Sequence, residues 1–147
     1  MRSTLLAVLL LVSFNALGQQ AKLYHLGPWN GGTNNVAATS TNTVTDSYIA
    51  VSEFDTIGVA ITLRPVSTST GTVVFNFAEA IGDYYETTPS HSITVTLSGT
   101  NTITTPGNFT VANAGTFALV QTVSTNAMGM TNVIIEVRLK APKRKTF

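Results

Sequence analysis

Residues 92–97 read Ser-Ile-Thr-Val-Thr-Leu, a strict alternation of polar and apolar side chains. Successive side chains of a β-strand point to opposite faces, so Ile93, Val95 and Leu97 share one face and hydroxyl groups occupy the other. An α-helix would scatter the same residues around its circumference. The stretch therefore predicts a strand with one face in a core and the other in water.

The same period recurs on both sides of this strand. It is found, with some irregularity, in residues 47–52, 56–64, 72–77, 102–105, 108–111, 115–123 and 132–140. Turn signals separate these stretches: Pro65 closes one, Ser67–Gly71 forms a polar turn, and Pro106 with Gly107 divides two more. This pattern predicts an all-β fold, a single β-sandwich or jelly roll of about eight strands.

Composition favours the same fold. Only 10% of the 147 residues are charged and 44% are hydrophobic, whereas about 25% are charged in an average soluble domain. Threonine supplies much of the missing polarity, and β-branched residues fit a pleated sheet better than a helix. The length predicts one domain.

The first 18 residues are different in character. Arg2 precedes an apolar run from Thr4 to Phe14, and the small residues Ala16 and Gly18 follow. These are the parts of a secretory signal peptide, and the run is shorter than the ~20 residues that a stable membrane span needs. The alternative is an apolar arm that is retained and buried in a neighbouring subunit. We therefore divide the chain into residues 1–18 (signal-like segment or assembly arm), 19–45 (loop-rich lead), 46–140 (β-sandwich) and 141–147 (basic tail).

Residues with catalytic potential are few and scattered. There is no cysteine, and the two histidines, His25 and His91, lack the spacing of a metal site, so we expect both to be surface or turn residues. Neither a Gly-x-Ser-x-Gly elbow nor a phosphate-binding glycine loop is present. We expect no enzymatic activity, no metal and no cofactor.

Two groups of residues are candidates for binding a partner. The first is the loop with Asp83, Tyr84, Tyr85 and Glu86, preceded by the nearby carboxylate Glu79. Such a loop could bind a sugar or a protein, or simply connect two strands with a tyrosine packed over the end of the sandwich. The second is Trp29, which could stack on a sugar ring or anchor the lead.

Charge is distributed unevenly. From Leu23 to Val137 the chain carries seven carboxylates and one arginine, whereas the last ten residues carry five basic residues, among them Arg144. A basic tail can contact an anionic surface or remain solvated. We expect no nucleic-acid binding, because no stripe of arginine and aromatic residues accompanies the tail.

Two segments carry a resemblance to a known class of proteins. Residues 74–89, Val-Phe-Asn-Phe-Ala-Glu-Ala-Ile-Gly-Asp-Tyr-Tyr-Glu-Thr-Thr-Pro, and the ending from Thr131 to Lys145 are similar to parts of small phage head-surface proteins. Ile81-Gly82-Asp83 departs from the loop order usual in those proteins. The resemblance implies a non-catalytic decoration or minor capsid role on a virion, although a signal-like N-terminus would be unusual there.

The sequence thus favours a structural protein of a surface assembly, located on a virion or exported from the cell. Its partners would be copies of itself or a lattice protein. The alternatives are a secreted cell-surface or filament subunit (pilus, matrix or adhesin) and, below these, a carbohydrate-binding module that takes a glycan. Strands with so few charged residues predict self-association.

Overall fold

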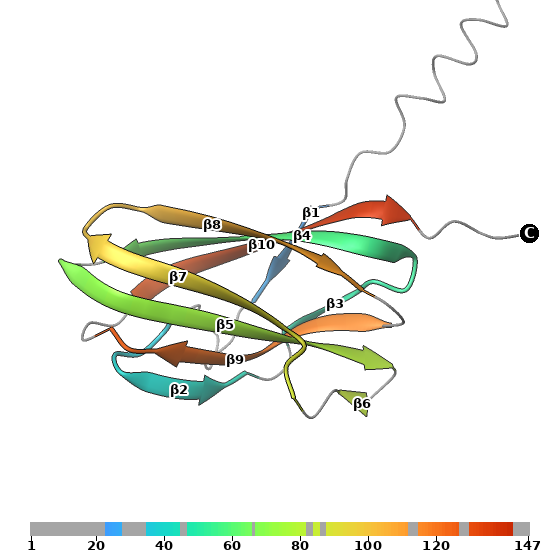
Figure 1. The fold of residues 1–147 in the computed structure, drawn as a ribbon, viewed down its shortest axis with the longest axis horizontal. Coiled ribbons are helices and arrows are strands. Elements are labelled where there is room, and N and C mark those ends of the chain that lie inside the picture. Colours follow the sequence, from blue (N-terminus) through green and yellow to red (C-terminus); the bar gives the residue numbers. More distant parts are fainter. Residues whose placement is uncertain are drawn as a thin grey trace, which may run out of the picture.

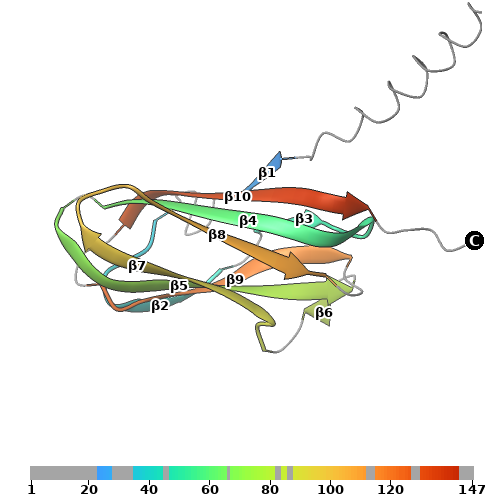
Figure 2. The same ribbon diagram turned by 45° about the horizontal axis from the view of Figure 1, so that its top comes forward.

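The computed structural model describes residues 23–27, 35–44, 47–65, 67–81, 84–85, 88–111, 115–126 and 130–142. These residues form ten β-strands and no helix, and the strands lie in two layers that face one another (Figures 1 and 2). The all-β prediction is confirmed. Within the described ranges there is no helix long and apolar enough to cross a membrane.

The first sheet has four antiparallel strands. Their order is β1 (Leu23–Leu26), β10 (Met130–Pro142), β4 (Phe54–Pro65) and β8 (Ile103–Thr110). Strand β10 is much longer than β1, so β1 covers only part of its edge. Strand β8 forms the opposite edge of the sheet.

The second sheet is also antiparallel. Its strands are β2 (Ser40–Thr43), β3 (Tyr48–Ala50), β9 (Thr116–Ser124), β5 (Ser69–Ile81), β6 (Tyr84–Tyr85) and β7 (His91–Gly99). Strands β2 and β3 pair with one edge of β9, and β6 and β7 pair with the far edge of β5. The sheet is therefore four strands wide.

The chain repeatedly crosses between the sheets. Only the pairs β2–β3, β5–β6 and β6–β7 are consecutive strands of one sheet, and every other connection leads to the opposite layer. Two four-stranded antiparallel layers joined in this way form a jelly roll. If β2 with β3 is counted as one strand and the two-residue β6 is set aside, the predicted number of about eight strands is confirmed.

The core lies between the two sheets and consists of the inward faces of the alternating strands. Its fully buried side chains include Phe75, Phe77, Phe117, Ile61 and Ile135. In β9 the alternation of inward and outward side chains is interrupted at Val120, which has no partner residue in the pairing with β5. This β-bulge turns Phe117 and Leu119 inward before it and Thr122 and Ser124 inward after it.

Two predicted turns are wrong. Pro106 and Gly107 do not divide two strands but lie within the continuous strand β8. Because β8 is an edge strand, the missing N–H of Pro106 costs the sheet no necessary hydrogen bond. The predicted turn at Ser67–Gly71 is also too long, since β5 begins at Ser69. Pro65, by contrast, is the last residue of β4, as predicted.

The edges formed by β7 and β8 meet across the two layers, and this contact depends on Gly107. A Cβ atom placed on Gly107 would lie 2.7 Å from Cδ1 and 3.0 Å from Cγ1 of Ile93 in β7. Carbon atoms normally approach to about 3.5–4.0 Å. A residue without a side chain at position 107 therefore lets the two layers close on this side.

The predicted signal-like segment of residues 1–18 and most of the basic tail lie outside the described residues, as does much of the lead. Those boundaries stay predictions. The described part of the lead holds β1, β2 and a single backbone bridge between Val36 and Met130.

Candidate interaction surface

The residues predicted to bind a partner are placed only in part. Trp29, Asp83, Glu86 and Arg144 lie outside the described residues. Tyr84 and Tyr85 form β6, whose backbone pairs with Ala80 and Ile81, but their side chains are not described. The predicted binding loop and the role of Arg144 therefore stay predictions.

His91 does not lie where the sequence suggested, and Glu79 lies beside it. Glu79 lies within β5 and His91 is the first residue of β7, on the neighbouring strand. Both side chains lie on the inward face of their strands, and the Glu79 side chain is only 14% exposed and the His91 side chain only 16%. The prediction that His91 is a surface or turn residue is therefore wrong. His25 does lie on the surface, in β1.

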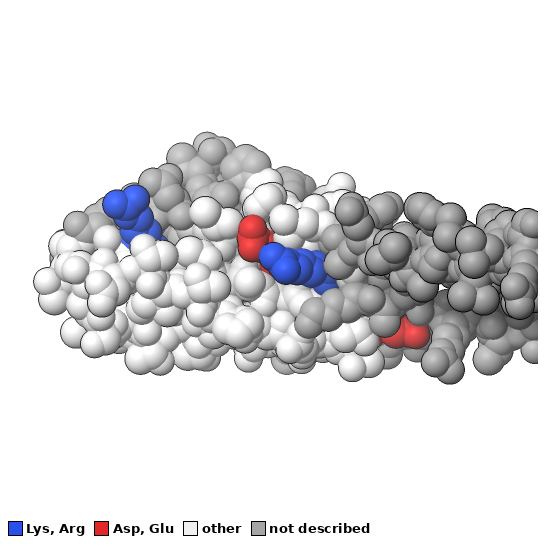
Figure 3. All heavy atoms as spheres, turned by 90° about the horizontal axis from the view of Figure 1, so that it is seen from above, with Lys and Arg blue, Asp and Glu red and all other residues white. Residues whose placement is uncertain are grey.

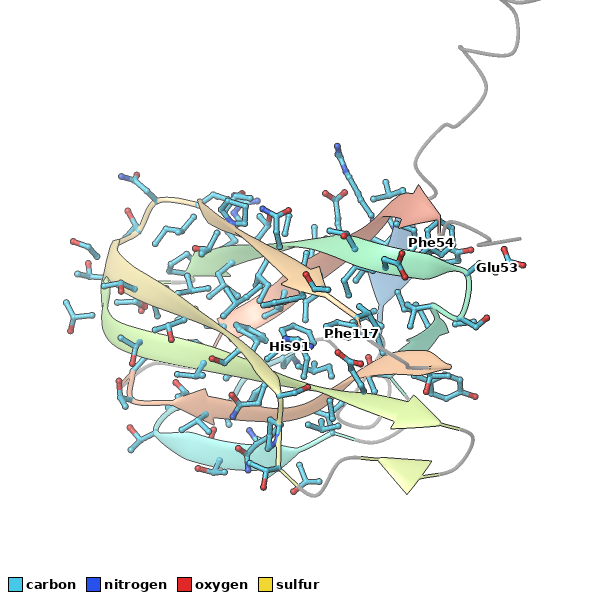
Figure 4. The ribbon with its side chains drawn as sticks, turned by 45° about the vertical axis from the view of Figure 1, so that its right-hand side comes forward. Glu53, Phe54, His91 and Phe117 are labelled. Atoms are coloured by element: carbon cyan, nitrogen blue, oxygen red, sulfur yellow. The ribbon has the colours of Figure 1, made fainter. Side chains whose placement is uncertain are left out.

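The two inward side chains are bonded to one another. Nε2 of His91 lies 2.7 Å from Oε1 of Glu79, which fits an imidazole N–H donating to the carboxylate. The histidine ring lies against aromatic rings of the core, with ring centres 4.7 Å from Phe109 and 5.8 Å from Phe117. Figure 4 shows His91 and Phe117 together between the layers, with Phe54 nearer the end of the sandwich.

This pair is best explained as a satisfied polar contact inside an aromatic cluster. Phe77 and Phe117 stack with centres 5.1 Å apart, and Phe109 packs against both rings. A histidine oriented by a carboxylate is also part of a hydrolytic triad, which requires in addition a nucleophile on the free ring nitrogen. Among the described residues no group of three His, Cys, Asp or Glu could hold a metal ion.

The outer face of the second sheet has an unusual charge distribution. The six strands of this sheet contain one carboxylate, Glu79, and one histidine, His91, and no lysine or arginine. Both titratable side chains point inward. The outward side chains of these strands therefore carry no charge at all.

The backbone registers show how this outer face is built. One row across the sheet reads Thr41, Val123, Val74 and Thr94, on β2, β9, β5 and β7 in turn. The next row reads Thr43, Gln121, Asn76 and Ser92. We call these two rows the neutral face. The valines and amides of its centre are half-buried, and the hydroxyl groups at its margins are exposed.

One contact ties the centre of the neutral face together. Nδ2 of Asn76 donates to Oε1 of Gln121 at 2.9 Å. The amides of adjacent strands are thereby held side by side. Charged residues are depleted at the core of protein–protein interfaces, and the centre of the neutral face, with two valines and two mutually bonded amides, shares this property.

The outer face of the first sheet differs. Strands β4 and β10 turn Arg64 and Arg138 to the exterior, and the half-exposed Glu136 lies 3.6 Å from the exposed His25 of β1. Figure 3, which looks onto this side of the molecule, shows basic and acidic side chains dispersed among uncharged ones. The two outer faces of one sandwich are therefore chemically distinct.

Sequence reasoning could have found part of this asymmetry. The absence of charge in residues 67–78 and 92–123 is visible in the sequence. That residues 69–78, 92–99 and 116–123 of these stretches lie in one sheet with residues 40–43 depends on strand pairing between distant segments, which the sequence pattern does not reveal.

No protein-family model matches the sequence, and no curated protein matches it. Among solved structures, tripeptidyl peptidase 2 contains a similar region, with a TM-score of 0.55 and 8% identity over 84% of this chain. The chain spans only 10% of the length of that protein. At such low identity the likeness extends to the fold alone.

Two further solved structures are similar over their own length. A carbohydrate-binding module of lichenase 5A from Cellvibrio mixtus, solved with cellotriose, has a TM-score of 0.47 and 15% identity, covering 84% of this chain and 91% of its own. The empty top component of cowpea mosaic virus has a TM-score of 0.45 and 11% identity, covering 86% of both chains.

Proposed function

We propose that this protein is a non-enzymatic structural subunit of a surface assembly, and that it packs against copies of itself or against a lattice protein. The observation that carries the proposal is the absence of charge among the outward side chains of the second sheet, which include the neutral face. Burying a charged side chain is costly unless it is paired. Short hydroxyl and valine side chains lose little rotamer entropy on burial, and a hydroxyl group can donate to or accept from a hydroxyl group of the partner. A face of this composition is suited to permanent contact.

The most specific form of the proposal is a virion decoration or minor capsid component. Its support is the resemblance of residues 74–89 and 131–145 to small phage head-surface proteins, together with a jelly-roll fold. The competing form is an exported subunit of a cell-surface filament, adhesin or matrix. It is supported by the signal-like composition of residues 1–18.

The absence of enzymatic activity belongs to the same proposal. Glu79 and His91 are the described residues closest to a catalytic pair, and their short mutual contact within the aromatic cluster serves packing. A hydrolase would need a nucleophile and room for a substrate beside the ring. Hydrolytic activity that is lost in a His91→Gln variant of unchanged stability would contradict the proposal.

The mass of the intact protein from its native source separates the two forms. Cleavage after Gly18 would leave a chain that starts at Gln19, and that mass would favour the exported subunit. A mass that includes residues 1–18 would favour the virion component, with the apolar segment as an assembly arm.

Sedimentation velocity over a wide range of protein concentrations tests self-association, which both forms of the proposal require. A strict monomer at high concentration would contradict both forms.

A further inference from the structure

The neutral face has an internal symmetry that points to a particular partner. The first row, Thr41–Val123–Val74–Thr94, has the same residue types when it is read from either end. The second row is close to symmetric, with a hydroxyl at each end and two amides in the middle, Gln121 and Asn76. The line of symmetry runs along the strands, between β9 and β5.

We infer that a second copy of this chain packs face to face on the neutral face, about a two-fold axis that runs along this line. The inference rests on the proposed function and specifies which surfaces of two copies would be in contact. Rotation about such an axis places β5 of one copy over β9 of the other. Val74 then lies over Val123 of the partner subunit, and Asn76 lies over Gln121 of the partner subunit.

The chemistry of the face favours a copy of itself over an unrelated partner. A partner with charged side chains would bury them against a face that offers no opposite charge, which is unfavourable. The first sheet offers charges on its own outer face, so it does not fit. The neutral face of a second copy brings no charge to the contact, and sheets that pack face to face lie about 10 Å apart.

The available area is sufficient for such a contact. Strands β7 and β9 each have nine residues. At about 3.3 Å per residue and about 4.8 Å between strands, a layer four strands wide measures roughly 30 by 19 Å, or about 570 Å². A contact that extends from the neutral face over the whole outer side of the second sheet in both copies would bury roughly 1,100 Å², above the ~1,000 Å² expected of a specific interface.

The pairing of Val74 with Val123 of the partner subunit permits a test by charge exchange. Val74→Lys alone places two lysines against valines in the dimer, and Val123→Asp alone places two aspartates there. Each variant should weaken self-association by at least about 100-fold, because the new charge is buried without a partner. Thr104→Lys adds the same charge to the exposed outer side of β8 in the first sheet and is the matched control.

Mixing the two variants should restore the contact. In a mixed dimer, the lysine at position 74 of one chain faces the aspartate at position 123 of the other, and the remaining Val74 and Val123 face each other. Sedimentation of the equimolar mixture should therefore show dimers that neither variant forms alone. The same restoration is not expected when Val74→Lys is mixed with the wild-type chain.

Three other outcomes are distinguishable. Unchanged association of Val74→Lys, with its thermal unfolding intact, would overturn the inference but leave the proposed assembly standing. Loss of association in both variants without restoration on mixing would overturn the two-fold pairing. A wild-type chain that stays monomeric at all concentrations would overturn the inference together with the proposed function.

Discussion

The close approach of β7 and β8 at Gly107 leads to a prediction with a defined size. In Gly107→Ala the new methyl group would lie 2.7 Å from Cδ1 of Ile93 and 3.3 Å from Cζ of Phe109. Overpacking of this kind costs about 1–3 kcal/mol. Gly107 is not one of the glycines with a positive φ angle, so alanine causes no backbone strain and regains about 0.4–1 kcal/mol through the unfolded chain. We expect a net loss of about 1–2 kcal/mol in the free energy of unfolding.

Shortening Ile93 should relieve this clash. Ile93→Val removes Cδ1, the atom nearest to the new methyl group, and alone should cost about 0.5–1.5 kcal/mol. If the steric explanation is right, the double variant Gly107→Ala with Ile93→Val should be less destabilised than the sum of the single variants by about 1 kcal/mol. Distant, independent substitutions add to within about 0.3–0.5 kcal/mol.

Urea unfolding followed by circular dichroism, at one protein concentration for all four chains, measures this coupling. Gly99→Ala is the control. No atom lies within 4 Å of its added methyl group, but its φ of +84° strains any side chain. Its cost should therefore be the same with Ile93 or valine at position 93. If the losses in free energy of unfolding caused by Gly107→Ala and Ile93→Val add in the double variant, the steric explanation of the close approach of β7 and β8 is refuted.

Three further predictions concern the core and the tail. Removal of one partner of the Glu79–His91 pair by Glu79→Ala should cost about 2–4 kcal/mol, whereas Glu79→Met with His91→Phe should recover most of it, because an apolar pair needs no hydrogen bond; urea midpoints that show no recovery would contradict this. Phe77→Ala, at a fully buried ring stacked on Phe117, should cost about 3–5 kcal/mol against less than about 0.5 for Thr94→Ala. Deletion of residues 143–147, which contain three basic side chains, should reduce the salt dependence of assembly measured by light scattering if the tail contacts the acidic body of a neighbour; an unchanged dependence would dismiss that contact.

Much of the fold could be predicted because alternation is a local property. The side chains of Ile93, Val95 and Leu97 all lie in the core, as the period of residues 92–97 indicates. The same holds for Ile57, Val59, Ile61 and Leu63 of β4. Each pattern needs only the pleat of one strand and the burial of one face.

The alternation of polar and apolar residues gave wrong predictions at two kinds of position: at a β-bulge inside a strand, and in a strand at the edge of a sheet. The bulge at Val120 turns Thr122 and Ser124 inward, although polar residues are expected to face water. Pro106 predicts a break because prolines end most strands, but at the edge of a sheet its missing N–H costs no necessary hydrogen bond. The local sequence does not show whether a strand lies at the edge or in the centre of a sheet.

The candidate surface divides in the same way between sequence and structure. The sequence by itself determined most of the strand-forming segments, the scarcity of charge and the lack of a catalytic motif, since these are properties of neighbouring residues. Only the tertiary structure decided that His91 turns inward onto Glu79 and that Val74 lies beside Val123, 49 positions later in the chain. Strand partners are chosen by the packing of both sheets around a common core, and this free energy belongs to the whole domain rather than to any one segment.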